Sequence, residues 1–174
     1  MSKLIDIPEE ELVGMMMSSV QDVFKTMLSL QVDLDKHESS VPSEEHCTPA
    51  FSTTSEMIAA NVGFSGKIYG MVYLCMDVSL ARSLTMQMLG MDDVDADDHE
   101  TINDALGELA NMTVGGFKNQ LSHKGYSCQL TIPSILRGTA FTVESTSQAQ
   151  RETFYFDTEG QRFVADLFIR KGDE

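Results

Sequence analysis

The residues with the clearest chemical potential are a carboxylate and a carboxamide in the middle of the chain. Glu108 and Asn111 are three positions apart, so on a helix their side chains project next to each other. Such a pair can bind a cation and orient a water molecule, because the amide both donates and accepts hydrogen bonds. Solvated helix faces are also rich in these residue types, so the pair alone is weak evidence for a site.

A long helix is expected to carry this pair. Residues at helical spacing form its core face. They are Ile102, Leu106, Leu109, Thr113 and Phe117. The opposite face has Asp104, Glu108, Asn111, Gly115 and Lys118. Gly107 and Gly115 each weaken a helix by about 1 kcal/mol relative to Ala. Glycine on an exposed helix face indicates that another backbone approaches it closely.

Hydrophobic patterns predict the elements around this helix. The predicted helices span residues 8–30, a short segment that Ser79 caps, and the long helix, which follows the acidic linker 92–100 and ends near Gly125. The predicted strands are 56–64, 67–76, 126–132, 140–144, 153–157 and 162–169, with the start of another at 31–34. Residues 35–49 are expected to form a polar loop, and residues 157–160 a tight turn. The order helix, strands, two helices, strands predicts an α+β fold with an antiparallel or mixed sheet covered by helices.

Length and charge limit the classes of function. A chain of 174 residues with 42% hydrophobic residues suits one domain, 1–174, with a real core. The net charge of -15, from 27 acidic and 12 basic residues, argues against nucleic acids and anionic membranes as partners. Cys47, Cys75 and Cys128 are far apart in the sequence, which favours reduced thiols and a cytoplasmic location.

An acidic cluster before the long helix offers a weaker alternative. Asp93, Asp95 and Asp97 alternate like the first ligands of a calcium-binding loop. The sixth position is Asp98 where such a loop needs glycine, and the twelfth is Asp104 where it needs a bidentate glutamate. An acidic linker is therefore favoured over a calcium site, and no metal site is predicted.

The four histidines are interpreted as solvated side chains, because no pair has the spacing of a zinc site or of an HExxH helix. They are His37, His46, His99 and His123.

The stretch from Asp104 to Pro133 resembles the CheX-like and CheC-like chemotaxis phosphatases. The sequence motif of these families is an acidic residue, then Glu-x-x-Asn, then a distant proline. The matching residues here are Asp104, Glu108, Asn111 and Pro133. The resemblance covers roughly residues 56–140, about half of the chain by count.

The first helix differs from the two-site members of these families. It contains Glu9, Glu10 and Glu11, but no asparagine follows any of them at the third position. The resemblance therefore implies one site per chain, as in the CheX-like proteins.

The resemblance implies a phosphatase that acts on a phosphorylated response-regulator receiver such as phospho-CheY. By this resemblance, Asn111 orients a water molecule for attack on phosphorus, and Glu108 pairs with a receiver lysine. The receiver supplies Mg²⁺, so no cofactor of the protein's own is expected. Partner docking is assigned to Asp104 and Lys118, and to Gly107 and Gly115, which leave room for the receiver backbone.

A non-catalytic role is the alternative. The same fold is similar to the middle domains of flagellar switch proteins, where it serves as a scaffold that binds a receiver or a switch component. The presence of both Glu108 and Asn111, together with Pro133, favours catalysis. The resemblance also implies a homodimer that pairs through sheet edges, and the strands within residues 153–169 are the candidate edges.

Overall fold

One antiparallel sheet with helices on one face organises the chain. The computed structural model describes residues 5–40, 55–139, 143 and 148–172. In chain order, the elements are α1 (Glu9–Val23), a π-helical turn (Phe24–Leu28), β1 (Asp33–Ser40), β2 (Met57–Gly66), β3 (Ile68–Asp77), α2 (Val78–Leu89), α3 (His99–His123), β4 (Cys128–Leu130), β5 (Ser134–Gly138), β6 (Gln150–Thr158) and β7 (Gln161–Lys171). The strand order is β1-β6-β7-β3-β2-β4, and β5 also pairs with β2.

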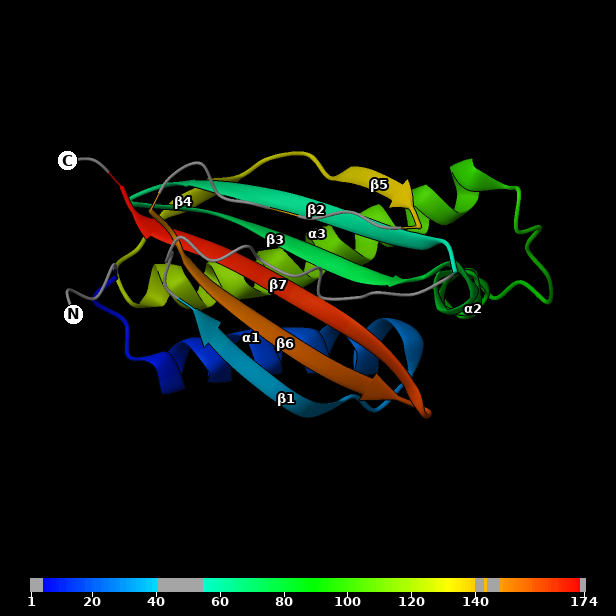
Figure 1. The fold of residues 1–174 in the computed structure, drawn as a ribbon, viewed down its shortest axis with the longest axis horizontal. Helices are drawn as coiled ribbons and strands as arrows, with labels where there is room; N and C mark the ends of the chain where they lie inside the picture. The colour runs from blue at the N-terminus through cyan, green and yellow to red at the C-terminus, as the bar shows by residue number, and fades with distance from the viewer. Residues whose placement is uncertain (1–4, 41–54, 140–142, 144–147, 173–174) are drawn as a thin grey trace.

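All described strand pairings are antiparallel, which confirms the predicted α+β class. In Figure 1, α1 and α3 lie behind the sheet, and α2 lies at one end of it. The helix α3 contacts α1, α2 and the strand β2, so it lies in the middle of the helical layer.

The predicted helices are present, with one correction to a cap. The first helix follows Pro8 and has three glutamates in its first turn, where the helix dipole favours negative charge. The predicted cap Ser79 is wrong: Asp77 caps α2 instead, because its carboxylate accepts a hydrogen bond of 2.7 Å from the backbone N–H of Leu80.

Two pairs of the predicted strands form antiparallel hairpins. β2 and β3 pair along their lengths around a turn at Lys67. β6 and β7 meet at the predicted turn, where Glu159 and Gly160 have φ values of 52° and 78°. The backbone N–H of Gly160 donates to the Asp157 carboxylate at 3.2 Å, which stabilises this turn.

Three strand predictions need correction. The polar segment 35–40, expected to be a loop, belongs to β1, because its backbone pairs with β6 while its charged side chains face solvent. The strand β5 was not predicted, and the predicted strand 140–144 lies largely outside the described residues. The proposed edge strands within 153–169 are interior strands, because β6 lies between β1 and β7, and β7 between β6 and β3. A homodimer itself stays a prediction.

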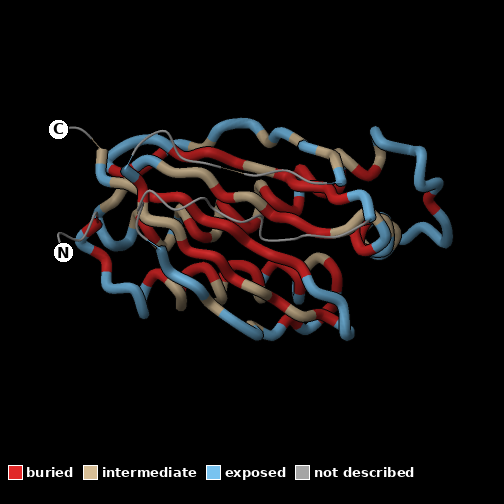
Figure 2. Tube along the Cα trace, in the orientation of Figure 1, coloured by how far each residue is buried: buried red, intermediate tan, exposed pale blue. Residues whose placement is uncertain are grey.

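The core lies between the sheet and the helices, as the buried segments in Figure 2 show. The rings of Phe24 and Phe163 stack with centroids 4.8 Å apart, which joins the π-helical turn to β7. Phe64 and Phe117 meet edge to face at 6.1 Å and join β2 to α3. None of the described helices is both long enough and apolar enough to span a membrane.

Candidate active site

The helix α3 carries both the core face and the candidate site. All five residues of the predicted core face are buried. Asp98 caps the N-terminus: its carboxylate accepts hydrogen bonds from the Thr101 hydroxyl at 2.7 Å and the Thr101 backbone N–H at 3.2 Å. These bonds hold the pKa of the Asp98 carboxyl below its ordinary value. The helix then continues without interruption to His123, so the candidate residues lie on a rigid support.

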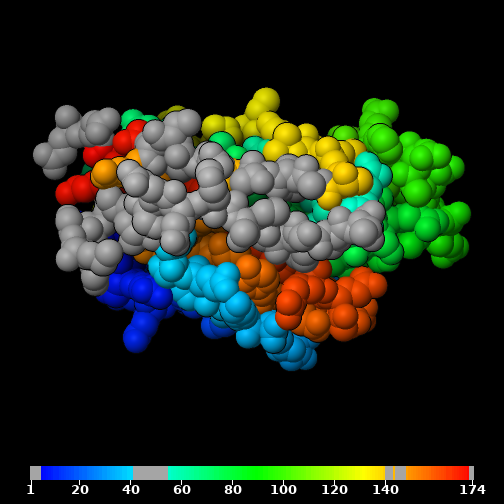
Figure 3. Space-filling model, viewed as in Figure 1, coloured from blue at the N-terminus to red at the C-terminus, as the bar shows by residue number. Residues whose placement is uncertain are grey.

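A pocket of about 640 Å³ lies between α3 and the segment that joins β4 to β5. Five helix residues and five residues from β4, the joining segment and β5 line it. They are Asn103, Asp104, Gly107, Glu108, Asn111, Leu130, Thr131, Ile132, Pro133 and Ile135. The β4–β5 segment (yellow) lies along the upper edge of the molecule in Figure 3.

Glu108 and Asn111 both line this pocket, one helical turn apart. Glu108 is exposed and Asn111 is half-buried. Within the described part of the chain, neither side chain forms a hydrogen bond or an ion pair. A carboxylate and a carboxamide in this position keep their full hydrogen-bonding capacity for a ligand or partner.

Gly107 lies under Pro133, which differs from the predicted exposed position. Gly107 is buried, and a Cβ atom built on it would lie 3.5 Å from Cβ of Pro133. The absence of a large side chain at position 107 therefore lets the β4–β5 segment pack onto α3 within the chain. Gly107 could not be assigned to the buried part of the helix from its periodicity, because the residue that covers it is 26 positions away.

Hydrogen bonds to β2 fix the wall opposite the helix. The backbone N–H of Thr131 donates to the Gly63 carbonyl at 2.8 Å, and the Gly63 N–H donates to the Thr131 hydroxyl oxygen at 2.9 Å. The Thr131 hydroxyl in turn donates to the carbonyl of Ile132 at 3.3 Å. The wall is thus tied to the interior of the sheet on one side of Ile132 and packed against α3 through Pro133 on the other.

Arg137 fixes one end of the pocket. Its Nη2 atom on β5 donates to Oδ1 of Asn103 on α3 at 2.7 Å. The Nε and Nη1 atoms of this guanidinium group are buried, and they have no hydrogen-bond partner among the described residues. The bond positions Asn103 next to the candidate carboxylates on the helix.

The pocket contains some of the predicted site residues but not all. Asp104, Gly107, Glu108, Asn111 and Pro133 are together in its lining. Gly115 and Lys118 lie farther along α3, outside the lining.

Sequence reasoning missed the other half of the pocket. The missed lining residues are Asn103, Leu130, Thr131, Ile132 and Ile135. Most of them lie beside Pro133, so the position of that proline was the available signal.

The acidic linker has structural roles. Asp93 accepts a hydrogen bond from Nη2 of Arg82 at 2.5 Å, and the Asp95 carboxylate accepts one from the backbone N–H of Asp97 at 2.9 Å. Asp98 is the cap of α3. These contacts are those expected of a linker and a helix cap, and the absence of a calcium site stays a prediction.

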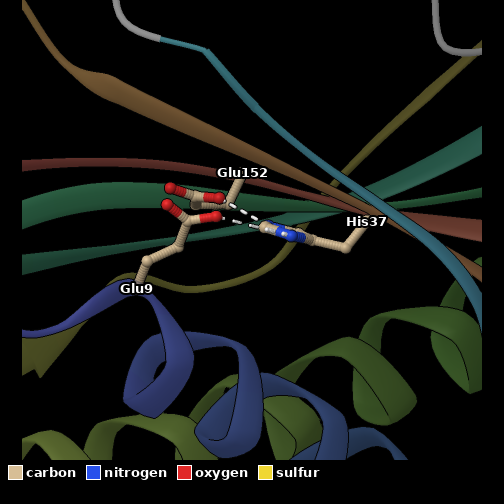
Figure 4. Close-up of side chains that lie close together, drawn as sticks. All are labelled: Glu9, His37 and Glu152. Atoms are coloured by element: carbon tan, nitrogen blue, oxygen red, sulfur yellow. Dashed lines mark hydrogen bonds and ion pairs between the residues drawn. The ribbon is translucent and has the colours of Figure 1, made fainter.

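A second polar cluster lies away from the pocket, between α1, β1 and β6 (Figure 4). Nε2 of His37 is 2.5 Å from Oε2 of Glu152, and its Nδ1 is 3.9 Å from Oε1 of Glu9. Glu152 is fully buried and also accepts from Ser39 at 2.8 Å and from Gln150 at 2.5 Å. The interpretation of His37 as solvated was wrong, because its buried partner is far away in sequence.

This cluster has the residue types of a metal site but the geometry of a hydrogen-bonded clamp. Two donor atoms on one zinc ion are separated by more than 3 Å, because each lies about 2.0–2.2 Å from the metal. The 2.5 Å between His37 and Glu152 is a hydrogen-bond distance. The cluster therefore joins the start of α1 to the edge of the sheet.

The fold and the pocket define an α+β protein whose central helix presents a carboxylate and a carboxamide that have no partner among the described residues. The family model described as chemotaxis phosphatase CheX matches residues 58–157. This match covers more than half of the chain, and the chain belongs to the CheX family. No curated protein sequence matches the chain.

Solved structures share the fold. The chemotaxis protein CheX from Desulfovibrio desulfuricans is 22% identical, with a TM-score of 0.77 over 92% of this chain and 99% of that chain. A CheC-like superfamily protein from Shewanella sp. PV-4 gives the same identity and TM-score over 94% and 99%. The CheX–CheY–BeF3–Mg²⁺ complex from Borrelia burgdorferi is 19% identical, with a TM-score of 0.66 over 92% and 98%.

Proposed function

We propose that this protein accelerates hydrolysis of the aspartyl phosphate on a CheY-type receiver. One observation carries the proposal: Glu108 and Asn111 line one pocket, a helical turn apart, and neither side chain has a partner within the described chain. Membership of the chemotaxis phosphatase family supports the reaction class. The relative from Borrelia burgdorferi was crystallised with CheY, BeF3 and Mg²⁺, which supports a receiver as the partner.

In the proposed reaction, a water oxygen attacks phosphorus and the bond from phosphorus to the receiver aspartate breaks. The aspartate leaves as a carboxylate, and inorganic phosphate forms. Asn111 orients the water by accepting a hydrogen bond from it through the amide oxygen and donating one from the amide N–H to a phosphoryl oxygen. This contribution is one of positioning, as phosphoryl transfer generally requires. A hundredfold acceleration needs only about 2.7 kcal/mol of barrier lowering, which is within the range of two well-placed side chains.

The other residues hold the receiver. Glu108 pairs with the receiver lysine and fixes the helix in register, and Asp104 contributes to docking at the same pocket. Gly115 and Lys118 extend the docking surface along α3 beyond the pocket. The receiver supplies the Mg²⁺ that neutralises the phosphoryl oxygens, so the free protein needs no metal of its own. A cytoplasmic location follows from this partner, because receivers act inside the cell.

The test is phosphate release from a CheY-type receiver charged with acetyl phosphate, with and without this protein. Asn111→Ala should abolish the acceleration, and Asn119→Ala should retain it, because Asn119 is exposed on the same helix outside the pocket. Melting temperatures should match for all three proteins, since neither asparagine is in the core. If the wild type binds the receiver without accelerating phosphate release, the protein is a scaffold. If Asn111→Ala keeps wild-type turnover, the catalytic assignment is wrong.

A further inference from the structure

We propose that Ile132 is the apolar anchor through which this protein binds the receiver surface beside the phosphorylated aspartate, an inference that rests on the function proposed above. Ile132 is 86% exposed, whereas the other exposed large hydrophobic residues of the described chain range from 37% to 49%. A scattered apolar side chain on a surface needs no explanation. This one lines the same pocket as Glu108 and Asn111.

The backbone on both sides of Ile132 is held in place. The preceding residue, Thr131, forms two hydrogen bonds with Gly63 in β2. The following residue, Pro133, has a restricted φ angle and packs against Gly107 on α3. An exposed side chain on a fixed backbone loses little backbone entropy on binding, which is the property that a preorganised anchor requires.

The surroundings of Ile132 match the anatomy of a binding site. Leu130 and Ile135 are half-buried in the same wall and extend its apolar surface toward the sheet. The polar side chains of Glu108 and Asn111 lie on the opposite wall. An apolar anchor next to a few polar groups is typical of the centre of a protein interface.

The charge of the pocket favours a receiver, rather than a second copy of this chain, as the binding partner. The pocket has two carboxylates, Asp104 and Glu108, and no basic residue in its lining. The chain as a whole has a net charge of -15, so a second copy would meet like charge at this surface. A receiver with a lysine and a bound Mg²⁺ ion beside its phosphoryl group supplies the complementary charge, and an apolar patch beside them would contact Ile132.

The experiment measures affinity and turnover separately. A CheY-type receiver loaded with beryllofluoride and Mg²⁺ is titrated into wild type, Ile132→Ala, Ile132→Asp and the control Leu89→Ala. Leu89 is 49% exposed on α2 and is not part of the pocket lining. Phosphate release at saturating receiver gives kcat for the same proteins.

Ile132→Ala should weaken binding about tenfold, which corresponds to about 1.4 kcal/mol. Ile132→Asp should weaken it further, and both should retain kcat within about twofold and keep the wild-type melting temperature. Leu89→Ala should match wild type throughout.

Three outcomes overturn the inference. If Ile132→Ala binds the receiver as tightly as wild type while Asn111→Ala is inactive, the anchor is wrong and the proposed function stands. If wild type sediments as a dimer and Ile132→Ala as a monomer with unchanged receiver affinity, the residue serves self-association instead. If wild type neither binds the receiver nor accelerates phosphate release, the anchor and the proposed function fail together.

Discussion

Gly107 on α3 lies directly against the ring of Pro133, so that a Cβ atom at position 107 would be 3.5 Å from Cβ and 4.0 Å from Cγ of the proline. These are ordinary van der Waals distances. Both residues line the pocket between α3 and the β4–β5 segment, together with the polar pair Glu108 and Asn111. The packing of a glycine and a proline thus sets the width of the candidate active site.

Gly107→Ala should stabilise the protein. The new methyl group fits, and alanine is favoured over glycine in a helix by up to about 1 kcal/mol. For a chain of this size, the melting temperature should rise by about 2–4 °C. Gly107→Leu should instead push Pro133 away and lower phosphate release by about tenfold or more. The matched control is Gly14→Leu on α1, whose Cβ position has no neighbouring atom within 4 Å among the described residues. If Gly107→Leu keeps full activity, the pocket wall formed by the β4–β5 segment does not depend on the contact between Gly107 and Pro133.

Glu108→Ala should weaken binding of the receiver as well as turnover. If its carboxylate pairs with the receiver lysine, its loss leaves that charge without a partner, and affinity should fall by about tenfold to a hundredfold. The difference from wild type should shrink as salt is added, because the pair lies at an exposed site. Titration of the receiver into wild type and Glu108→Ala at two ionic strengths measures this difference in affinity. Glu100→Ala, an exposed glutamate in the first turn of the same helix, should change nothing. Equal affinities for the two variants would remove Glu108 from the interface.

Glu152→Ala should be strongly destabilising. The substitution removes the acceptor of three side chains, those of His37, Ser39 and Gln150. Leaving a buried donor without its hydrogen-bond acceptor costs about 1–3 kcal/mol. Glu38→Ala on the neighbouring strand is the control, because Glu38 makes an exposed ion pair with Lys36 that contributes at most about 1 kcal/mol. Denaturant unfolding measures the free energy of unfolding of both variants. A melting temperature that rises with added Zn²⁺ in wild type but not in Glu152→Ala would show a metal site in place of the clamp.

The thiol of Cys75 should resist alkylation in the folded protein. Burial, with a smaller contribution from the Asp166 carboxylate, raises the pKa of Cys75 to about 12. At pH 8 the thiolate fraction is then roughly 10⁻⁴, and only the thiolate reacts. Mass spectrometry after iodoacetamide treatment should find Cys75 unmodified in the native protein and modified in guanidinium. Rapid native labelling would contradict the burial of this side chain.

The same shift predicts a pH dependence of stability. The folded-state pKa is raised above the ordinary value of 9.0, so the contribution of Cys75 is fully present below pH 9 and is lost as pH rises toward about 12. Stability measured between pH 8 and 11 should therefore fall more steeply for wild type than for Cys75→Ala. Parallel curves would show that Cys75 does not contribute to this slope.

The sequence pattern was sufficient to predict those elements that depend on contacts between residues close in the sequence. The helix α3 was predicted because Ile102 and Phe117 mark the two ends of one continuous apolar stripe. The hairpin of β6 and β7 was predicted from a turn whose glycine has a positive φ. Glu108 and Asn111 were assigned to one site from their spacing, and both line the pocket.

Contacts between residues far apart in the sequence account for the wrong predictions. The strand β1 was interpreted as a loop because its charged residues resemble a solvated segment, whereas β6 supplies its hydrogen bonds from more than a hundred positions away. His37 was interpreted as solvated for the same reason. Ile132 was assigned to a strand and had no sign of function in the sequence, because only the fold brings its segment next to α3.

The arrangement of β4 and β5 also bears on solubility. Both strands pair with β2, β4 with Phe64–Gly66 and β5 with Met57–Asn61, and the regular strand pairing is interrupted between them. This side of the described sheet therefore ends in two short strands with a gap, and the opposite side ends in β1, which has Asp33, Asp35, Lys36 and Glu38. Short edges and charged edges are the two common protections against strand-to-strand aggregation. The interruption that forms the pocket wall therefore also leaves no long continuous edge strand with which another chain could pair.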